Sequence, residues 1–276
     1  MHPTPDSGPS ALLDQIDQRQ TLINRYRPFT DKRLLDQLKS YYRIGLVYTS
    51  NALEGFTYSE SETRILIEEG LTAGGKSLRD ALAVTGHAKA CDYMFELLHS
   101  ATIAEENVLF FHKLLEGSLD NESVPGEYRT TAAFVFSKGT GKTFLKPSQI
   151  PVAMEDFFSF AANERDKYHP VEFAAILHKK LVSIHPFADG NGRVSRLVMN
   201  ASLIQKSFLP IIIPPILRAE YIDSLNASDQ GNDSGFMNFM FRRQIEGQKE
   251  IIRLIEGEDY VLAGTGFPAE KPREKT

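Results

Sequence analysis

Apolar residues recur along this chain with the period of an α-helix. Between residues 34 and 46 the set is Leu34, Leu35, Leu38, Tyr42 and Leu46, and between residues 173 and 184 it is Phe173, Ile176, Leu177, Leu181 and Ile184. Residues spaced by three or four positions line one face of a helix, which turns toward the core when it is apolar. Most of the chain follows this spacing, so the pattern predicts a mainly α-helical protein.

Residues that start and stop helices divide this pattern into segments. Ser59 and Glu62 form a capping-box sequence ahead of an apolar stretch, and Gly70 can close the helix that follows. These signals predict a helical hairpin over about residues 31–69. One more helix is expected at 236–255.

One segment departs from the helical pattern. Over residues 131–145, β-branched and aromatic residues flank a glycine-rich turn, which predicts a β-hairpin. The letters GTGKT in this segment resemble the end of a phosphate-binding P-loop. That motif needs a glycine five positions before the Gly-Lys pair, and Phe136 stands there, so we interpret the letters as a turn.

Composition and charge narrow the class of protein. The chain has 276 residues and a formal net charge of -5, which argues against a protein that coats nucleic acid, and no DNA-binding module is recognised. Its single cysteine, Cys91, cannot form an internal disulfide. The longest apolar run, 208–217, is too short to span a membrane and contains three prolines. We expect a cytoplasmic protein with a flexible N-terminus at 1–20 and a polar tail at 258–276.

The sequence HPFADGNGRVSR at 185–196 concentrates groups that can do chemistry. Pro186 cannot continue the helix predicted over 172–184, so that helix stops at the histidine before it. A second helical period begins at Val194, which places the Gly-Asn-Gly sequence 190–192 at the entrance of a new helix. Backbone N–H groups at a helix entrance form a site for anions.

The side chains around this entrance fit a nucleotide. Arg193 and Arg196 lie in the first turn of the helix, where two cations oppose its dipole and favour an anionic ligand. A lone carboxylate beside phosphates, here Asp189, is typical of a magnesium site. An imidazole titrates near neutral pH, so a histidine such as His185 can act as a general base. The alternative is an ordinary helix-loop-helix connection with a surface histidine and solvated arginines.

The motif at 185–196 resembles the signature of the Fic family, and the similarity extends over about residues 24–255. The resemblance implies a Fic-type helical bundle with a small β-hairpin flap. It places an N-terminal helical region at 21–100 and the catalytic core at 101–257. It also implies an enzyme, a magnesium-dependent nucleotidyltransferase that transfers AMP from ATP to a Ser, Thr or Tyr hydroxyl of a target protein.

The resemblance also implies roles for the signature residues. His185 would be the catalytic base and Asp189 the magnesium ligand, Gly190, Asn191 and Gly192 would hold the α-phosphate region, Arg193 the neighbouring phosphates and Arg196 the γ-phosphate. The motif alone does not identify the target protein.

A second sequence feature lies far upstream, in SNALEG at residues 50–55. It resembles the autoinhibitory motif of the Fic family, with Ser50 and Glu54 as the defining residues. Glu54 is placed in the last turn of a helix with Gly55 after it, where the helix dipole disfavours a negative charge. The resemblance implies that Glu54 pairs with Arg196 and occupies the room of the γ-phosphate. The alternative is an exposed glutamate at a frayed helix end.

Two further expectations follow from the resemblance. The hairpin at 131–145 would be a flap that docks the target protein by β-augmentation. The segment from Arg218 resembles the part of the family that contacts adenine, and Tyr221 is a candidate for stacking on the base. Ile222 and Asp229 depart from the family pattern there, which leaves the nucleotide preference open. A homodimer that adjusts the helix bearing Glu54 is also plausible.

Two other functions compete with transfer of AMP. In the first, Glu54 orients water and His185 protonates the leaving hydroxyl, so the protein removes AMP from a modified target. In the second, the protein is a regulatory module that binds ATP without turnover.

His178 lies on the same helix face as His185, but without a third ligand we interpret it as a packed histidine and not a metal ligand.

Overall fold

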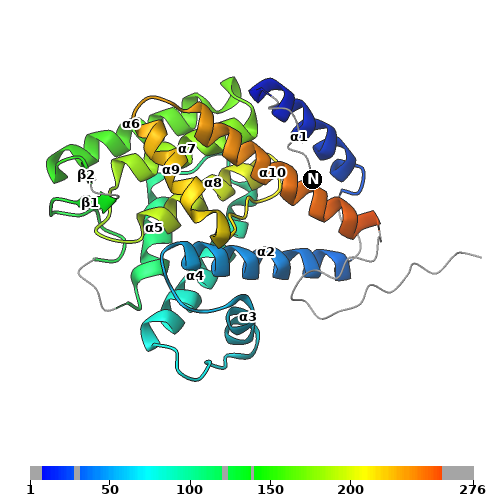
Figure 1. Cartoon of the computed structure of the whole chain (residues 1–276), viewed down its shortest axis with the longest axis horizontal. Coiled ribbons are helices and arrows are strands. Elements are labelled where there is room, and N and C mark those ends of the chain that lie inside the picture. Colours follow the sequence, from blue (N-terminus) through cyan, green and yellow to red (C-terminus); the bar gives the residue numbers. More distant parts are fainter. Residues whose placement is uncertain (1–7, 28–31, 120–123, 138–139, 257–276) are drawn as a thin grey trace, which may run out of the picture.

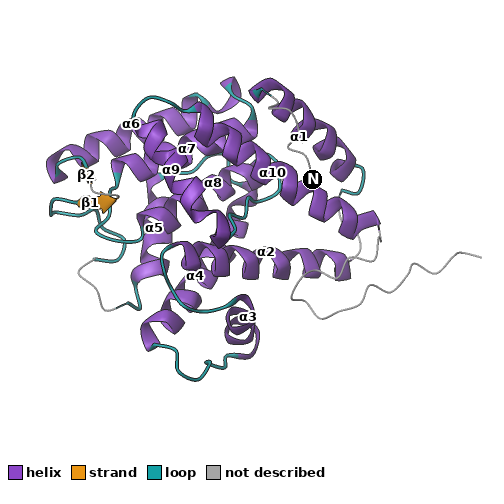
Figure 2. Cartoon of the chain, viewed as in Figure 1, coloured by secondary structure: helices purple, strands orange, loops and turns teal. Residues whose placement is uncertain are grey.

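The computed structural model describes residues 8–27, 32–119, 124–137 and 140–256. These residues form ten α-helices: α1 (Pro9–Asn24), α2 (Lys32–Leu53), α3 (Glu60–Glu69), α4 (Leu78–Glu96), α5 (Glu105–Glu116), α6 (Ile150–Asn163), α7 (Pro170–Ile184), α8 (Asn191–Gln205), α9 (Arg218–Asp229) and α10 (Ser234–Glu256). Four short 3-10 helices are η1 (Leu97–His99), η2 (Pro147–Gln149), η3 (Arg165–Lys167) and η4 (Pro215–Leu217). The prediction of a mainly α protein is confirmed (Figure 2).

Helix α8 lies at the centre of the bundle. It packs against α7 along its length and also contacts α2, α4 and α5, so nearly all of its residues are buried. Figure 1 shows α8 among the other helices, with α2 passing below it and α3 beyond α2. An all-round buried helix is expected when its neighbours cover every face. The signature residues at its start are therefore held on a rigid element.

The predicted helix ends agree with the structure. Ser59 and Glu62 form a reciprocal capping box at the start of α3, and Gly70 ends that helix in the left-handed conformation with φ of 72°. Helix α7 begins at Pro170, two residues before the predicted position, and ends at Ile184 as expected.

The structure corrects the prediction that residues 1–20 are flexible. Residues from Pro9 onward form α1, whose buried Leu12 and Ile16 face the body of the protein. Figure 1 shows α1 beside α10, and Gln248 of α10 donates a hydrogen bond to the backbone oxygen of Ile16 at 3.1 Å. The helix was not predicted because the residues before it and at its start are rich in proline and serine, which are typical of irregular segments. Residues 1–7 and the predicted tail at 258–276 lie outside the described residues.

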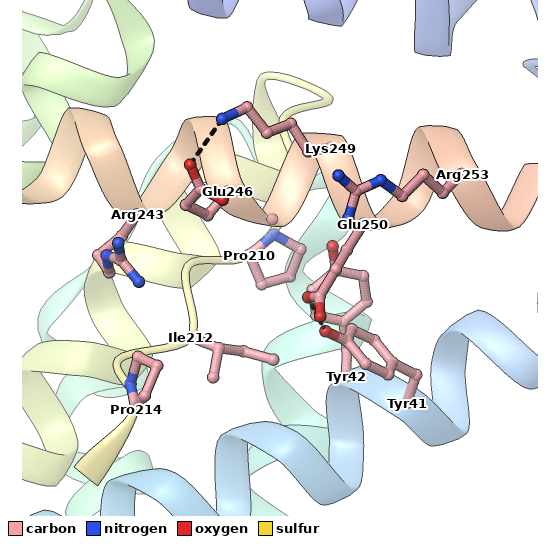
Figure 3. A pocket seen from close by; sticks show the side chains of 11 residues that line it. Tyr41, Tyr42, Pro210, Ile212, Pro214, Arg243, Glu246, Lys249, Glu250 and Arg253 are labelled. Carbon is pink, nitrogen blue, oxygen red and sulfur yellow. Dashed lines mark hydrogen bonds and ion pairs between the residues drawn. The ribbon is translucent and has the colours of Figure 1, made fainter. Parts of the chain in front are cut away.

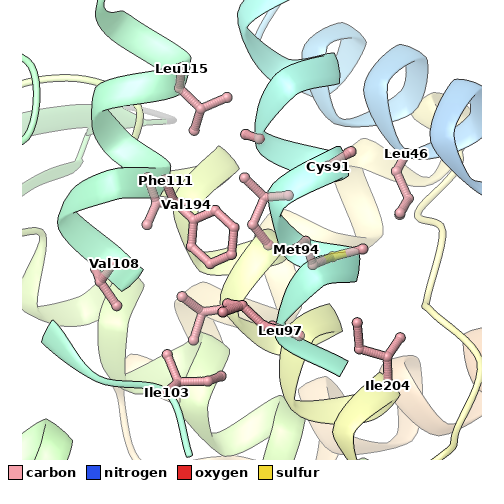
Figure 4. Close-up of a cluster of buried hydrophobic side chains, with 14 of the residues drawn as sticks. Leu46, Cys91, Met94, Leu97, Ile103, Val108, Phe111, Leu115, Val194 and Ile204 are labelled. Atoms are coloured by element: carbon pink, nitrogen blue, oxygen red, sulfur yellow. The ribbon is translucent and has the colours of Figure 1, made fainter. Parts of the chain in front are cut away.

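The predicted N-terminal region at 21–100 and catalytic core at 101–257 share one hydrophobic core. Met94 of α4 belongs to the same buried cluster as Phe111 of α5 and Val194 of α8 (Figure 4). Close contact between α4 and α5 is possible because Gly86 lies against the backbone of α5, where a Cβ would stand 2.6 Å from the oxygen of Leu114. The N-terminal helices and the signature helix therefore pack as one unit.

The segment predicted as a hairpin contains two short strands. Strand β1 (Phe134–Ser137) pairs antiparallel with β2 (Thr140–Thr143), with Phe134 opposite Thr143, at the edge of the helical body (Figure 1). Residues 138–139 lie outside the described residues. The P-loop-like letters continue into β2, and no α-helix follows them directly, as a P-loop would require. The role of this segment as a flap stays a prediction.

Within the described ranges, no helix has the length and apolar character needed to cross a bilayer.

Candidate active site

The loop between α7 and α8 carries the candidate catalytic histidine. His185 has φ of 53° and ψ of 58°, a left-handed conformation that residues other than glycine rarely adopt. Its N–H donates to the backbone oxygen of Leu181 at 3.1 Å, and its ring stacks on Phe144 with the centroids 3.8 Å apart. A strained backbone held in place by its surroundings is typical of functional sites.

Arg129 ties this loop to the hairpin segment. Its Nε donates to the backbone oxygen of His185 at 2.8 Å, and its backbone N–H donates to the oxygen of Pro186 at 2.9 Å. The two Nη atoms donate to the oxygens of Thr131 at 2.7 Å and Leu145 at 2.6 Å, at the two ends of the hairpin segment. The sequence analysis missed Arg129, whose only signal was its place directly before the predicted hairpin.

The interior of the loop is organised by Phe187. The side chain of Asn191 donates to the backbone oxygen of Phe187 at 2.8 Å and accepts from its N–H at 2.9 Å. The ring of His112 stacks on Phe187 with the centroids 3.9 Å apart. Burial lowers the pKa of His112 to about 4, so this ring is neutral. Asn191 therefore shapes the loop in this structure, and its contact with a phosphate stays a prediction.

Asp189 lies at the surface end of the loop. Its Oδ1 accepts from the N–H of Gly190 at 2.7 Å, and its Oδ2 lies 3.9 Å from a nitrogen of Arg79. An exposed carboxylate with remaining lone pairs fits a magnesium ion that takes its other ligands from phosphates and water. In the part of the chain that the structure describes, no three acidic, histidine or cysteine side chains gather as a metal site. The role of Asp189 as a magnesium ligand stays a prediction.

Arg193 is part of a buried ion pair. Its Nη2 donates to Oε1 of Glu116 at 2.6 Å, and the side chains are 1% and 0% exposed. Nε and Nη1 of Arg193 are buried and have no acceptor among the described residues. Gly190, with φ of 77°, allows Glu116 to approach, because a Cβ there would stand 3.0 Å from Oε1. Two donors of Arg193 thus lack an acceptor in the described part of the chain, and its contact with phosphates stays a prediction. Glu116 had no signal in the sequence.

Arg196 is held by three neighbours. Its Nε donates to Oγ of Ser50 at 2.8 Å, and its Nη2 donates to the backbone oxygen of Ser50 at 3.0 Å. The same Nη2 donates to Oε1 of Glu54 at 2.6 Å, while Nη1 lies 3.5 Å from the hydroxyl of Tyr221. The structure therefore brings both residues of the upstream motif to the second arginine of the signature.

Glu54 directly follows the last residue of α2. Gly55, with φ of 91°, and Phe56 donate their N–H groups to the oxygens of Ala52 and Asn51, a Schellman arrangement that ends the helix. Burial alone would raise the pKa of the Glu54 carboxyl, but Arg196 and more distant arginines outweigh burial and hold that pKa below its ordinary value. Glu54 is therefore a carboxylate at neutral pH.

The carboxylate of Glu54 lies over the entrance of α8. A Cβ placed on Gly192 would overlap Oε1 of Glu54 and approach Nη1 of Arg196 to 3.1 Å, so the contact depends on the glycine. The first N–H groups of a helix have no acceptor within the helix and attract anions. Glu54 thus places a carboxylate at this helix entrance, beside Gly192 and Arg196.

The structure does not support Tyr221 as a stacking residue for a base. Its side chain is buried, with the residue 2% exposed, and its hydroxyl forms a hydrogen bond with Nε2 of His178 at 2.8 Å. Burial lowers the pKa of His178 to about 3, so its ring is neutral. Tyr221 therefore supports Arg196 from the core, and His178 is the packed histidine that we expected.

The two departures from the family pattern lie nearby on α9. Asp229 accepts a hydrogen bond from the hydroxyl of Ser183 at 2.9 Å, and Ile222 packs against the buried cluster around Tyr221. Neither contact identifies a pocket for a base. The nucleotide preference therefore stays open.

The Fic/DOC family model matches residues 102–203, from just before α5 to near the end of α8. The protein adenylyltransferase Fic of Nematostella vectensis is 32% identical over 234 residues, which are 84% of this chain and 53% of that protein. The chain belongs to the Fic/DOC family. This Fic chain spans about half the length of the curated relatives that it matches.

Two solved Fic structures have the same fold. Fic-1 (aa134–508) from C. elegans is 26% identical, with a TM-score of 0.79 over 90% of this chain and 73% of that one. A Fic domain containing signaling protein from Bacteroides thetaiotaomicron has a TM-score of 0.81 at 24% identity, over 90% of this chain and 97% of that one. The predicted Fic-type helical bundle is therefore confirmed.

Proposed function

We propose that this Fic protein transfers AMP from ATP to a hydroxyl of a target protein, and that Glu54 restrains the reaction. The observation that carries the proposal is the Glu54–Arg196 pair at 2.6 Å over Gly192, at the entrance of the signature helix. The similarity to proteins named protein adenylyltransferase Fic supports the reaction type.

In the proposed reaction, the oxygen of a Ser, Thr or Tyr hydroxyl of the target attacks the α-phosphorus of ATP. The hydroxyl proton goes to His185, the new bond joins AMP to the target, and the bond to the β-phosphate breaks so that pyrophosphate leaves. His185 is suited to this role because Arg129 and Phe144 hold its backbone and its ring. Positioning of this kind contributes much of the rate in phosphoryl transfer.

The remaining signature residues would hold the triphosphate. Phosphate oxygens could accept hydrogen bonds from the N–H groups at Gly190 and Gly192. They could also accept from Nε and Nη1 of Arg193, which have no acceptor among the described residues. Asp189 would hold magnesium, which neutralises phosphate charge when bound. Arg196 would take the γ-phosphate once Glu54 leaves it.

Glu54 would restrain the reaction because its carboxylate and the γ-phosphate of ATP compete for the same place beside Arg196. With Glu54 bound to Arg196, the carboxylate repels the γ-phosphate and occupies its room beside Gly192. Ser50 keeps Arg196 turned toward α2 through two hydrogen bonds. A movement of the end of α2 would release the site, and a homodimer contact is one way to produce that movement.

The target protein is proposed to dock on the hairpin segment 131–145. Strand β1 pairs with β2 on one side, and Phe134 at its start is exposed. An added strand gains backbone hydrogen bonds that are largely independent of sequence. The link from this segment through Arg129 to His185 would align the bound hydroxyl with the base.

The test is intact mass after incubation with ATP and magnesium. We expect AMP to be added to the protein or to co-incubated lysate proteins by Glu54→Gly, weakly or not at all by the wild type, and not by Glu54→Gly combined with His185→Ala. Restraint by Glu54 is wrong if the single variant adds no more AMP than the wild type.

Removal of AMP from a modified target is the second candidate. The observation that favours it is the partial exposure of the Glu54 side chain, 36%, which leaves the carboxylate room to orient a water molecule. This function predicts the opposite sign: Glu54→Gly would lose the activity. Binding of ATP with no mass change in any variant would instead favour a nucleotide-sensing module.

A further inference from the structure

The residue that follows the Glu54–Gly55 turn also lies against the signature helix. The ring of Phe56 is half-buried, and the guanidinium carbon of Arg193 stands 5.1 Å from its centroid. The guanidinium carbon of Arg79, near the start of α4, stands 5.8 Å from the same centroid. Both distances are within the range in which a cation is attracted to an aromatic face. One side chain thus contacts two arginines at the candidate site.

Both arginines also face Asp189, the predicted magnesium ligand. Nη2 of Arg193 lies 4.0 Å from Oδ1 of Asp189, and Nη2 of Arg79 lies 3.9 Å from its Oδ2. The ring of Phe56 therefore lies close to the part of the loop that is predicted to hold magnesium and phosphates.

The donors of Arg193 are closed to solvent in this structure. Its side chain is 1% exposed, and its Nε and Nη1 are buried without an acceptor among the described residues. Glu116, which is also buried, holds Nη2 from inside the bundle. Phe56 is instead half-buried in the loop after α2. Of these two contacts, the one with Phe56 can therefore be released without opening the bundle.

Phe56 and Glu54 belong to one short segment at the end of α2. The N–H of Phe56 donates to the backbone oxygen of Asn51 at 3.2 Å, which closes the turn after the helix. The carboxylate of Glu54 binds Arg196. Only Gly55 separates the two residues, so a movement that takes Glu54 from Arg196 would also take Phe56 from its arginine partners.

We propose that Phe56 is a second restraining residue of this Fic protein, whose ring covers Arg193 while Glu54 occupies Arg196. The inference rests on the proposed function, because it takes ATP as the ligand of the two signature arginines. A ligand that binds only the open state has its affinity lowered by the fraction of molecules that are open. The contacts of the ring with Arg193 and Arg79 stabilise the closed state, so their loss raises the affinity for ATP.

The test is calorimetric titration of the full chain with ATP and magnesium, in the His185→Ala background so that no AMP is transferred. We expect Phe56→Ala to tighten ATP binding about threefold or more, the size expected for the loss of one or two cation–π contacts. If this variant fails to fold, Phe56→Leu keeps an apolar side chain in the loop and should change the affinity in the same direction.

The matched control is Tyr41→Ala, which removes an aromatic side chain from α2 far from the site. Tyr41 lies about 20 Å before Glu54 along the chain of the helix. It lines a separate cavity of about 340 Å³ between α2, α10 and the segment 210–214 (Figure 3). ATP should bind this variant as tightly as it binds the parent.

The proposal is overturned if both variants of Phe56 fail to gain affinity for ATP, or if Tyr41→Ala gains as much. The intact-mass assay keeps this outcome apart from a failure of the proposed function. Transfer of AMP by Glu54→Gly without a gain in affinity in the Phe56 variants rejects only the role of Phe56. Tighter ATP binding by Phe56→Ala, with no transfer by Glu54→Gly, supports the role of Phe56 and rejects transfer.

Discussion

Two arginines of α8, one helical turn apart, bind carboxylates in different ways. Arg193 and Glu116 are 1% and 0% exposed, whereas Arg196 is 7% and Glu54 is 36% exposed. Both contacts are 2.6 Å long, so distance does not distinguish them. The difference lies in where the carboxylate is held. Glu116 is the last residue of α5, inside the bundle, and Glu54 stands at the end of α2 next to solvent.

This contrast suggests one permanent pair and one that can open. Separating Arg193 from Glu116 would leave two charges in the interior without water, which costs several kcal/mol. Glu54 can turn into solvent, and Arg196 would keep its two hydrogen bonds to Ser50. A single helix turn can thus combine a structural pair with a releasable one.

The largest expected effect is that of removing the buried carboxylate. Glu116→Ala should lower the free energy of unfolding by about 3–5 kcal/mol, because Arg193 is left buried without its partner. Glu54→Ala should lower it by about 1 kcal/mol or less, as for a partly exposed pair. Urea denaturation of both variants measures the difference, and equal losses would remove the distinction between the two pairs.

A second substitution acts on the position of the helix that carries Glu116. Gly86→Ala would place a Cβ 2.6 Å from the backbone oxygen of Leu114 and push α5 away from α4. We expect a loss of about 1–3 kcal/mol in the free energy of unfolding. The control is Gly247→Ala in α10, where no atom lies within 4 Å of the new Cβ, and alanine should stabilise by up to about 1 kcal/mol. A neutral Gly86→Ala would contradict the close packing of α4 and α5.

The pH dependence of stability tests whether the charge of Glu54 stabilises the fold through its pair with Arg196. The folded pKa of Glu54 is below its ordinary value. Its charge therefore contributes stability above the unfolded value of about 4.3, and this contribution is lost as the pH falls through the folded pKa. The difference in melting temperature between wild type and Glu54→Gln should be constant near neutral pH and shrink below about pH 4.3. A difference that grows in acid would contradict this sign.

The smallest expected effect concerns the cap of α2. Arg218, an exposed residue, donates from Nε to the backbone oxygen of Leu53 at 2.7 Å, just before Glu54. Arg218→Met keeps an aliphatic chain but removes this donor, and should cost less than about 1 kcal/mol in the free energy of unfolding. A loss as large as that of Glu116→Ala would show that the end of α2 is as fixed as the buried pair.

Much of the fold was readable from local signals. Gly70 ends α3 and Gly190 precedes α8, because glycine readily adopts the left-handed conformation at a helix end. Pro186 follows the end of α7, because proline cannot continue a helix. The helix at Pro9–Asn24 was missed, since its few apolar residues follow a start rich in proline and serine. Only its packing on α10 shows that it is part of the body.

The candidate site was only partly predictable. The signature at 185–196 identified its loop, and the family resemblance implied the contact of Glu54 with Arg196. The resemblance made Tyr221 a candidate for stacking on a base, whereas the structure buries its side chain beside Arg196. The direction of a side chain on α9 depends on what packs against that helix.

The sequence by itself determined the helices, their ends and the motif at the entrance of α8, because these depend on residues within one or two turns of each other. Only the tertiary structure decided that Glu116 neutralises Arg193 across 77 positions, that Arg129 joins the hairpin to His185, and that Tyr42 faces a cavity. Such pairings arise when helices far apart in the chain pack together, and burial then decides which charges are fixed and which can be released.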